Sequence, residues 1–284
     1  MKDSPSDHRT IFSHEKETDA AGGQLGRVGS LTLLSVGMVL PTLLVLFYFI
    51  WTEGWSPHSQ QTAIALSKAA QFSLPLLWWL FFGPKGMLAL GAYRGNRLAW
   101  AGIAGQPGQV SSARLWRSIG EGLAFGVAAS AVIAGGYVLL EANSPLAGKA
   151  GQQIAAFLAR SGISTLWQYA VVSLGYSIIH AGLEEIYWRW FIFGGLCRFL
   201  SPWLALVAGS LAFTSHHVII LGVYLGWLSW GQAVGTLGVL VGGAYWAWLF
   251  WRTSSLLAPW LSHAVVDLAI FWVGFQLVGP YLSW

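Results

Sequence analysis

Long apolar runs recur along the 284-residue chain. The first, over about residues 30–51, holds no charged side chain and exceeds the roughly 20 residues that a helix needs to cross a bilayer. Six further runs cover about 62–82, 118–141, 165–186, 202–226, 231–251 and 254–279. The pattern predicts an all-α, polytopic transmembrane helix bundle of about seven spans. Six to eight spans are allowed, because charged and aromatic residues mix over 186–200.

The composition excludes several classes of soluble protein. Only 9% of the residues are charged, against about 25% in soluble domains. Hydrophobic residues make up 55%, and the 18 Trp and 35 Gly suit membrane interfaces and closely packed membrane helices. An ordinary cytosolic enzyme, a nucleic-acid-binding domain and a disordered chain are therefore excluded. The net charge of +4 is interpreted as loop charge that sets topology, and no nucleic-acid partner is expected.

Charge along the chain predicts its organisation and orientation. Residues 1–28 form a polar tail, 29–164 hold N-terminal membrane spans and a basic loop, and 165–284 form a membrane core with the candidate catalytic residues. With the N-terminus in the cytoplasm, the loop Lys and Arg fall inside except Lys149 and Arg160. Lys68 is expected to snorkel outward from the second span. We expect a multi-pass protein of a bacterial inner (plasma) membrane.

Ionisable side chains are scarce in the second half of the chain. A bilayer penalises such groups by several kcal/mol, so those that remain usually face a cavity and serve a function. The alternative is that these side chains are scattered structural polar groups. That interpretation fits poorly with a set that converges on three spans. The acidic members are Glu184, Glu185 and Asp267, and the histidines are His180, His216, His217 and His263.

Helical spacing separates the roles of the two adjacent glutamates. Glu185 and Arg189 are four residues apart, so they share a helix face and can form a structural ion pair. Glu184 points about 100° away and has no local cation, which suits a general base or acid. His180, one turn before Glu184, either bonds it or caps a polar pocket.

The remaining histidines follow the same spacing logic. His263 and Asp267 are four apart, so the carboxylate can hold one imidazole nitrogen while the other faces the reaction. His216 and His217 point about 100° apart, so at most one of them is central. Ser215 lies beside them, but the Gly-x-Ser-x-Gly elbow of serine hydrolases is missing around it.

Three motifs together resemble a known family of membrane proteins. They are Glu184-Glu185-x-x-x-Arg189, Phe213-x-x-x-His217 and His263-x-x-x-Asp267. The resemblance, over about 165–275, is to the CPBP (Abi) family of type II CAAX prenyl endopeptidases and bacteriocin-processing or immunity relatives. It implies intramembrane proteolysis by a glutamate-activated water, with the cut near the cytoplasmic leaflet.

The resemblance also implies residue roles. Glu184 is the general base and works with His217 on the water, while His263 and Asp267 stabilise the oxyanion or orient the site. Glu185, Arg189, Phe213 and His180 are supporting residues. Prenyl proteases carry Asn where this chain has Asp267, and an ionised Asp cannot donate a hydrogen bond. Asp267 is therefore expected to orient His263 or to be protonated.

Several alternatives stay open. A metal-free mechanism is favoured, with no cofactor, but zinc held by Glu184, His217, His263 and Asp267 is the alternative. The expected partner is a membrane-anchored or hydrophobic peptide or protein: a prenylated CAAX protein, a bacteriocin leader or a sorting tail. The rival functions are a non-catalytic immunity or scaffold protein of the same fold and a proton-coupled transporter.

Overall fold

A computed structural model describes residues 22–82, 112–143, 146–253 and 255–283 of the chain. These residues are almost entirely helical, with one isolated bridge between Thr165 and Ser283, which confirms the predicted all-α class. In chain order the helices are α1 (Gly22–Leu46), η3 (Phe47–Trp51), α2 (Pro57–Phe82), α3 (Ser112–Asn143), α4 (Leu146–Arg160), α5 (Leu166–Gly175), η4 (Tyr176–His180), α6 (Ala181–Glu185), η5 (Ile186–Phe193), α7 (Gly194–Leu196), α8 (Pro202–Leu225), α9 (Trp230–Thr253), α10 (Leu257–Val278) and η6 (Gly279–Tyr281).

Six of the described helices are long and apolar enough to cross a membrane. They begin with α1, which continues into η3, and include α2, α3, α8, α9 and α10. The predicted polar tail over 1–28 overlaps α1, which begins at Gly22. The rest of that tail, and most of the predicted basic loop, lie outside the described residues.

The fourth predicted span, over about 165–186, is part of a composite helix. The elements α5, η4, α6, η5 and α7 follow one another without interruption over 166–196, with right-handed helical backbone at every junction. The prediction ended this span near residue 186, at its cluster of charge. The helix continues because Arg189 is neutralised by Glu185 and because the aromatic residues of η5 are buried. We refer to residues 166–196 as the composite helix.

Two π-helical segments flank the paired glutamates in the composite helix. Segment η4 ends directly before α6, which carries Glu184 and Glu185, and η5 follows directly after it. Such segments widen the helix locally and occur often at functional sites. The helix begins with a capping box, in which Thr165 accepts from the backbone of Gln168 and Gln168 accepts from Thr165 in return.

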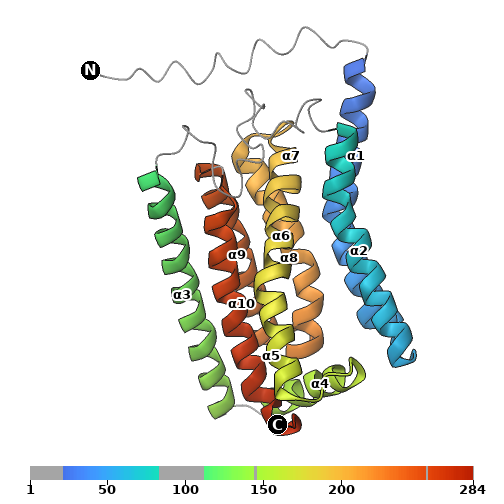
Figure 1. The fold of residues 1–284 in the computed structure, drawn as a ribbon, viewed down its shortest axis with the longest axis vertical. Coiled ribbons are helices and arrows are strands. Elements are labelled where there is room, and N and C mark those ends of the chain that lie inside the picture. Colours follow the sequence, from blue (N-terminus) through green and yellow to red (C-terminus); the bar gives the residue numbers. More distant parts are fainter. Residues whose placement is uncertain (1–21, 83–111, 144–145, 254, 284) are drawn as a thin grey trace.

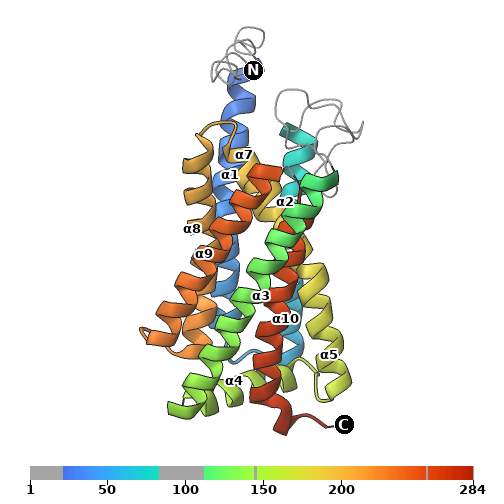
Figure 2. The same ribbon diagram turned by 90° about the vertical axis from the view of Figure 1, so that its left-hand side faces the viewer.

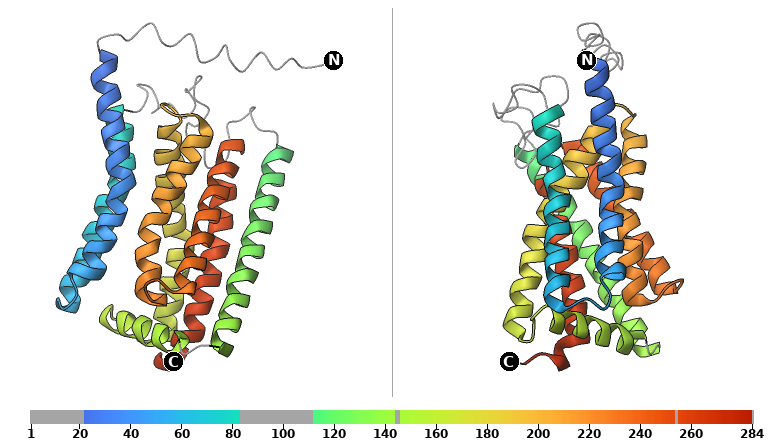
Figure 3. Two further views of the ribbon diagram at one scale, coloured as in Figure 1. Left: turned by 180° about the vertical axis from the view of Figure 1, so that it is seen from behind. Right: turned by 90° about the vertical axis from the view of Figure 1, so that its right-hand side faces the viewer.

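The long helices run roughly parallel to one another in one bundle (Figure 1). Helix α3 lies on one side and the α1–α2 pair on the other, and the composite helix runs between them (Figures 1 and 3). Helix α4 lies across the end of the bundle where α5 begins and where the chain ends (Figure 2). The start of α1 and the connection from α7 to α8 lie at the opposite end.

Close packing joins the helices that carry the site. Helix α10 packs along α3, where a Cβ on Gly122 would stand 2.7 Å from the Ala258 carbonyl oxygen and one on Gly126 would stand 2.9 Å from the Ser262 carbonyl oxygen. Such glycines let two backbones approach closely without a side chain between them. On the other side, the Tyr187 hydroxyl donates to the Gly37 carbonyl of α1 at 2.7 Å.

Candidate active site

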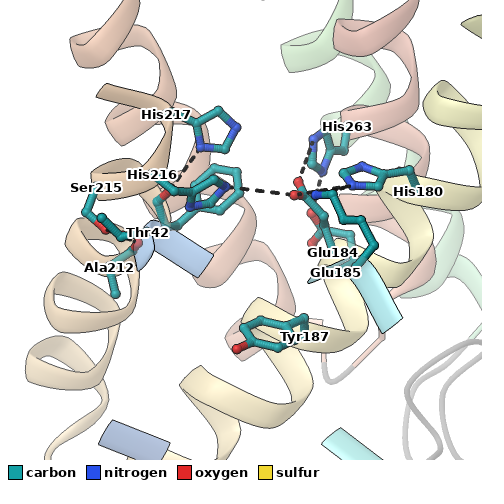
Figure 4. Close-up of polar contacts among 12 residues, drawn as sticks. Thr42, His180, Glu184, Glu185, Tyr187, Ala212, Ser215, His216, His217 and His263 are labelled. Carbon is teal, nitrogen blue, oxygen red and sulfur yellow. Dashed lines mark hydrogen bonds and ion pairs between the residues drawn. The ribbon is translucent and has the colours of Figure 1, made fainter. Parts of the chain in front are cut away.

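The polar residues of three helices meet inside the bundle. Glu184 and Glu185 come from α6, His216 and His217 from α8, and His263 from α10 (Figure 4). Glu184 and Glu185 are 4% and 0% exposed, so both carboxyl groups are shielded from bulk solvent and lipid. The structure therefore brings together side chains that lie about eighty residues apart in sequence, as the motifs predicted.

Glu184 lies at the centre of this cluster. Its oxygens are 3.9 Å from His180 Nε2, 4.0 Å from His216 Nε2 and 3.8 Å from His263 Nε2 (Figure 4). These distances exceed a direct hydrogen bond, and at such separations one water can contact both groups. Three imidazoles thus surround a carboxylate that makes no direct hydrogen bond to any of them.

Glu185 has a different environment on the same turn. Its Oε1 atom is 3.0 Å from Arg189 Nη1, which confirms the ion pair predicted from the four-residue spacing. The same oxygen accepts a hydrogen bond of 2.7 Å from His263 Nδ1. Because a carboxylate only accepts, His263 carries its proton on Nδ1 and turns Nε2 toward Glu184.

The two adjacent histidines of α8 are held in different ways. His216 is 3% exposed, stacks on Trp188 with an interplanar angle of 8°, and points Nε2 at Glu184. His217 donates from Nδ1 to the Phe213 carbonyl at 2.9 Å, so its Nε2 atom carries a lone pair. Among the described residues, the ion-pair contacts of Glu184 include His216 and do not include His217.

Asp267 is placed differently from the expectation. Its Oδ1 atom is 3.6 Å from His263 Nε2, the nitrogen that faces Glu184, whereas the orienting hydrogen bond to Nδ1 comes from Glu185. The reason is the register of α10 against α6, which the spacing within one helix does not reveal. Asp267 therefore borders the same space as Glu184.

Aromatic side chains complete the walls of the cluster. Phe213 is 2% exposed and lies under the Arg189 guanidinium at 4.8 Å, which gives this predicted supporting residue a defined place. Trp246 of α9 was not predicted. It stacks on His263 at 4.1 Å, lies 5.1 Å from the Arg189 guanidinium and donates to the Ser262 hydroxyl.

One hydroxyl group, of Ser215, and one amino group, of Lys68, also lie near the cluster. Ser215 donates to the Ala212 carbonyl and accepts from Thr42 of α1, so its hydroxyl serves helix packing. Lys68 was expected to snorkel outward, but its Nζ atom turns inward and lies 3.1 Å from His180 Nε2. The negative charge of Glu184, on another helix, attracts the ammonium, so the sequence pattern of α2 alone could not have revealed this position.

The ligands predicted for zinc are not grouped as a metal site in the described part of the chain. Among the described residues, which include all the proposed ligands, no three His, Cys, Asp or Glu side chains are arranged to hold one. The Glu184, His217, His263 and Asp267 set weighed from the sequence is thus not gathered around a single point.

Comparisons with known proteins bear on the segment that forms this cluster. One family model, that of the Rce1-like type II CAAX prenyl endopeptidases, matches the chain over residues 164–269. These residues include all three motifs. A search of curated proteins and a search of solved structures found no match to the chain. Residues 164–269 are thus similar to the Rce1-like family of CAAX-type membrane proteases, which confirms the resemblance predicted from the motifs.

Proposed function

We propose that this protein is an intramembrane endopeptidase in which Glu184 activates a water molecule. The observation that carries the proposal is the buried Glu184 carboxylate, which faces three imidazole nitrogens at 3.8–4.0 Å without a direct hydrogen bond. A base in this state keeps its lone pairs available to a water. The Rce1-like match over the same residues supports peptide-bond hydrolysis as the reaction.

The first step is addition of water to the scissile carbonyl. Glu184 takes one proton from the water while the water oxygen forms a bond to the carbonyl carbon, and the carbonyl electron pair moves onto its oxygen. His217 orients the water through Nε2, because its Nδ1 proton is engaged by the Phe213 carbonyl. This fixed tautomer gives the water a hydrogen-bond acceptor in addition to Glu184.

The second step is collapse of the tetrahedral intermediate. The oxyanion accepts a hydrogen bond from His263 when that ring carries a proton on Nε2 as well as on Nδ1. The C–N bond then breaks, and Glu184 returns its proton to the departing nitrogen. Glu185 and Arg189 hold His263 in place and need not touch the substrate.

The substrate is a membrane-associated protein or peptide, because the site lies within a bundle of membrane-length helices. Prenylated CAAX proteins, bacteriocin leaders and sorting tails fit this description equally. A bacterial inner membrane with the N-terminus in the cytoplasm is proposed from the distribution of loop Lys and Arg.

The test uses the full chain in proteoliposomes with membrane-anchored reporter peptides, including a prenylated CAAX peptide. Cleavage is followed by mass spectrometry. Glu184→Gln keeps the shape of the side chain and removes the base, so we expect it to lower kcat by about 10²–10⁴-fold. Glu53→Gln is the matched control, because Glu53 is exposed and lies outside the site.

Full cleavage by the Glu184→Gln protein would defeat the mechanism. The rival functions give other results in the same vesicles. A scaffold or immunity protein would cleave no reporter in any variant, and a carrier would show ion or proton flux that depends on Glu184 without peptide cleavage.

A further inference from the structure

Two charged side chains lie near the middle of the six membrane-length helices. They are Lys68 in α2 and Asp267 in α10. Arg27, Arg117 and Arg252 lie in the first or last turn of their spans. Glu121 lies in the second turn of its span and pairs with Arg117 and Arg252. An ionised side chain at mid-span is expensive, so its position needs a physical reason. Asp267 reaches the cluster around Glu184, and so does Lys68.

The contacts of Lys68 are few and specific. Its ammonium lies 3.1 Å from His180 Nε2 and 5.8 Å from the centre of the Phe72 ring. In the described part of the chain, no ion pair within 4.0 Å joins Lys68 to a carboxylate. Its direct polar partner is therefore an imidazole that itself adjoins the proposed general base.

The direction of this hydrogen bond defines the state of His180. A lysine ammonium only donates, so His180 Nε2 accepts and the ring proton resides on Nδ1. The same Nε2 atom lies 3.9 Å from Glu184 Oε1. While Lys68 occupies Nε2, that nitrogen has no proton to offer Glu184.

The ring of His180 is also confined. It meets Phe72 edge-on with centroids 5.6 Å apart and lies 4.9 Å from the Tyr176 ring at a tilt of 31°. Without a donor at Nε2, the other tautomer would aim an N–H group at Glu184 from nearly the same position. A direct hydrogen bond there would occupy the lone pair that the water needs.

We propose that Lys68 is a positioning residue of the active site, which keeps His180 from donating to Glu184. This inference rests on the proposed function and adds α2 to the helices that build the site. It assigns no substrate contact to Lys68. The positive charge on Lys68 also faces the ionised Glu184 across His180, so the ammonium and the carboxylate balance each other within the bundle.

The first test is a second-site rescue. Lys68→Met removes the donor and the charge, and we expect it to lower kcat by about 10- to 100-fold, the range of a charged hydrogen bond, with KM changed less than about threefold. Adding His180→Phe, which keeps the ring between Phe72 and Tyr176, should recover most of that loss. Lys68→Arg should retain activity, and Ala69→Met is the matched control on the exposed side of α2.

Either of two results would overturn the inference. One is normal kcat in Lys68→Met, and the other is a double variant no more active than Lys68→Met alone. Thermal unfolding of each variant identifies a loss of activity that comes only from misfolding. If Lys68→Met does not fold, Lys68→Gln replaces it, because glutamine keeps a neutral hydrogen-bond donor. Near-normal kcat is then expected. A loss of kcat by about 10- to 100-fold in Lys68→Gln would count against the proposal.

A second measurement does not depend on peptidase activity. The ¹⁵N NMR signals of the His180 ring report which nitrogen carries the proton. We expect an unprotonated Nε2 in the wild type and in Lys68→Arg, and a protonated Nε2 in Lys68→Met. A protonated Nε2 in the wild type would refute the inference even if cleavage is robust, whereas an unprotonated one in a protein without peptidase activity would refute only the proposed function.

Discussion

His263 Nδ1 and Glu185 Oε1 are 2.7 Å apart, and this hydrogen bond joins α10 to the composite helix at a fully buried point. The same oxygen pairs with Arg189. One carboxylate therefore both neutralises a buried guanidinium and orients the imidazole that faces Glu184.

This relationship predicts the behaviour of Glu185→Gln. The amide keeps the size of the side chain but loses the charge that orients His263 and pairs with Arg189. We expect kcat to fall by about 10- to 100-fold, as for other residues that orient an active-site histidine, with a small change in KM. Steady-state kinetics in proteoliposomes measure this, with Glu53→Gln as the control. An unchanged kcat would mean that Glu185 does not orient His263.

Arg189→Ala should affect stability more than chemistry. Arg189 is 1% exposed and lies against Phe213 and Trp246, so its removal leaves a cavity and a buried Glu185 carboxylate without its cation. Breaking a buried pair costs about 3–5 kcal/mol of unfolding free energy. Thermal unfolding in detergent measures the loss. Arg160→Ala, at an exposed position, is the control, and equal stability of the two variants would contradict the expectation.

The spacing of residues within one helix correctly predicted how the two adjacent glutamates differ. The Glu185–Arg189 pair and the separation of Glu184 from it follow from 3.6 residues per turn, and the structure confirms both. The convergence of Glu184 and His263 was predicted from the scarcity of charge in apolar helices and from the motif resemblance. The resemblance paired Glu184 with His217, whereas the α8 histidine with an ion-pair contact to Glu184 is His216.

Relationships between helices were predicted less well. The partner of His263 Nδ1, the inward direction of Lys68 and the stacking of Trp246 depend on how neighbouring helices are rotated against each other. That rotation is set by many packing contacts far apart in sequence. The π-helical segments escaped prediction for a related reason, since they shift the register of the helix without a distinct residue signal.

The adjacent histidines of α8 should differ in their importance. His217 has a fixed tautomer with a free Nε2 atom, whereas His216 Nδ1 makes no hydrogen bond among the described residues and its ring stacks on Trp188. We expect His217→Phe to lower kcat by about 10²–10⁴-fold. His216→Phe keeps the stacking and should lower kcat less than about tenfold. The reverse order would assign the water-orienting role to His216, whose Nε2 lies 4.0 Å from Glu184.

Asp267 can be tested through its hydrogen-bonding capacity. Its Oδ1 atom lies 3.6 Å from His263 Nε2, so it borders the proposed oxyanion position. Asn has the same shape and adds a donor, so Asp267→Asn should keep kcat within about tenfold of the wild type. Asp267→Ala removes both the hydrogen-bond acceptor and any donor at this position, and it should lower kcat by about 10- to 100-fold. A loss as large in Asn as in Ala would show that the carboxylate itself is needed.

Removal of metal ions should leave peptide cleavage intact. Catalytic zinc is normally held by three protein ligands. The described residues do not group three His, Cys, Asp or Glu side chains in an arrangement that could hold a metal ion. We expect purified protein dialysed against a chelator to retain its kcat and to contain far less than one zinc per chain by elemental analysis. Cleavage that disappears with the chelator and returns with one equivalent of zinc would replace the glutamate mechanism by a metal-assisted one.

The variant Glu184→Gln separates the glutamate mechanism further from the metal-assisted one. A zinc ligand set would lose metal on that substitution, whereas a general base would lose only its proton acceptor.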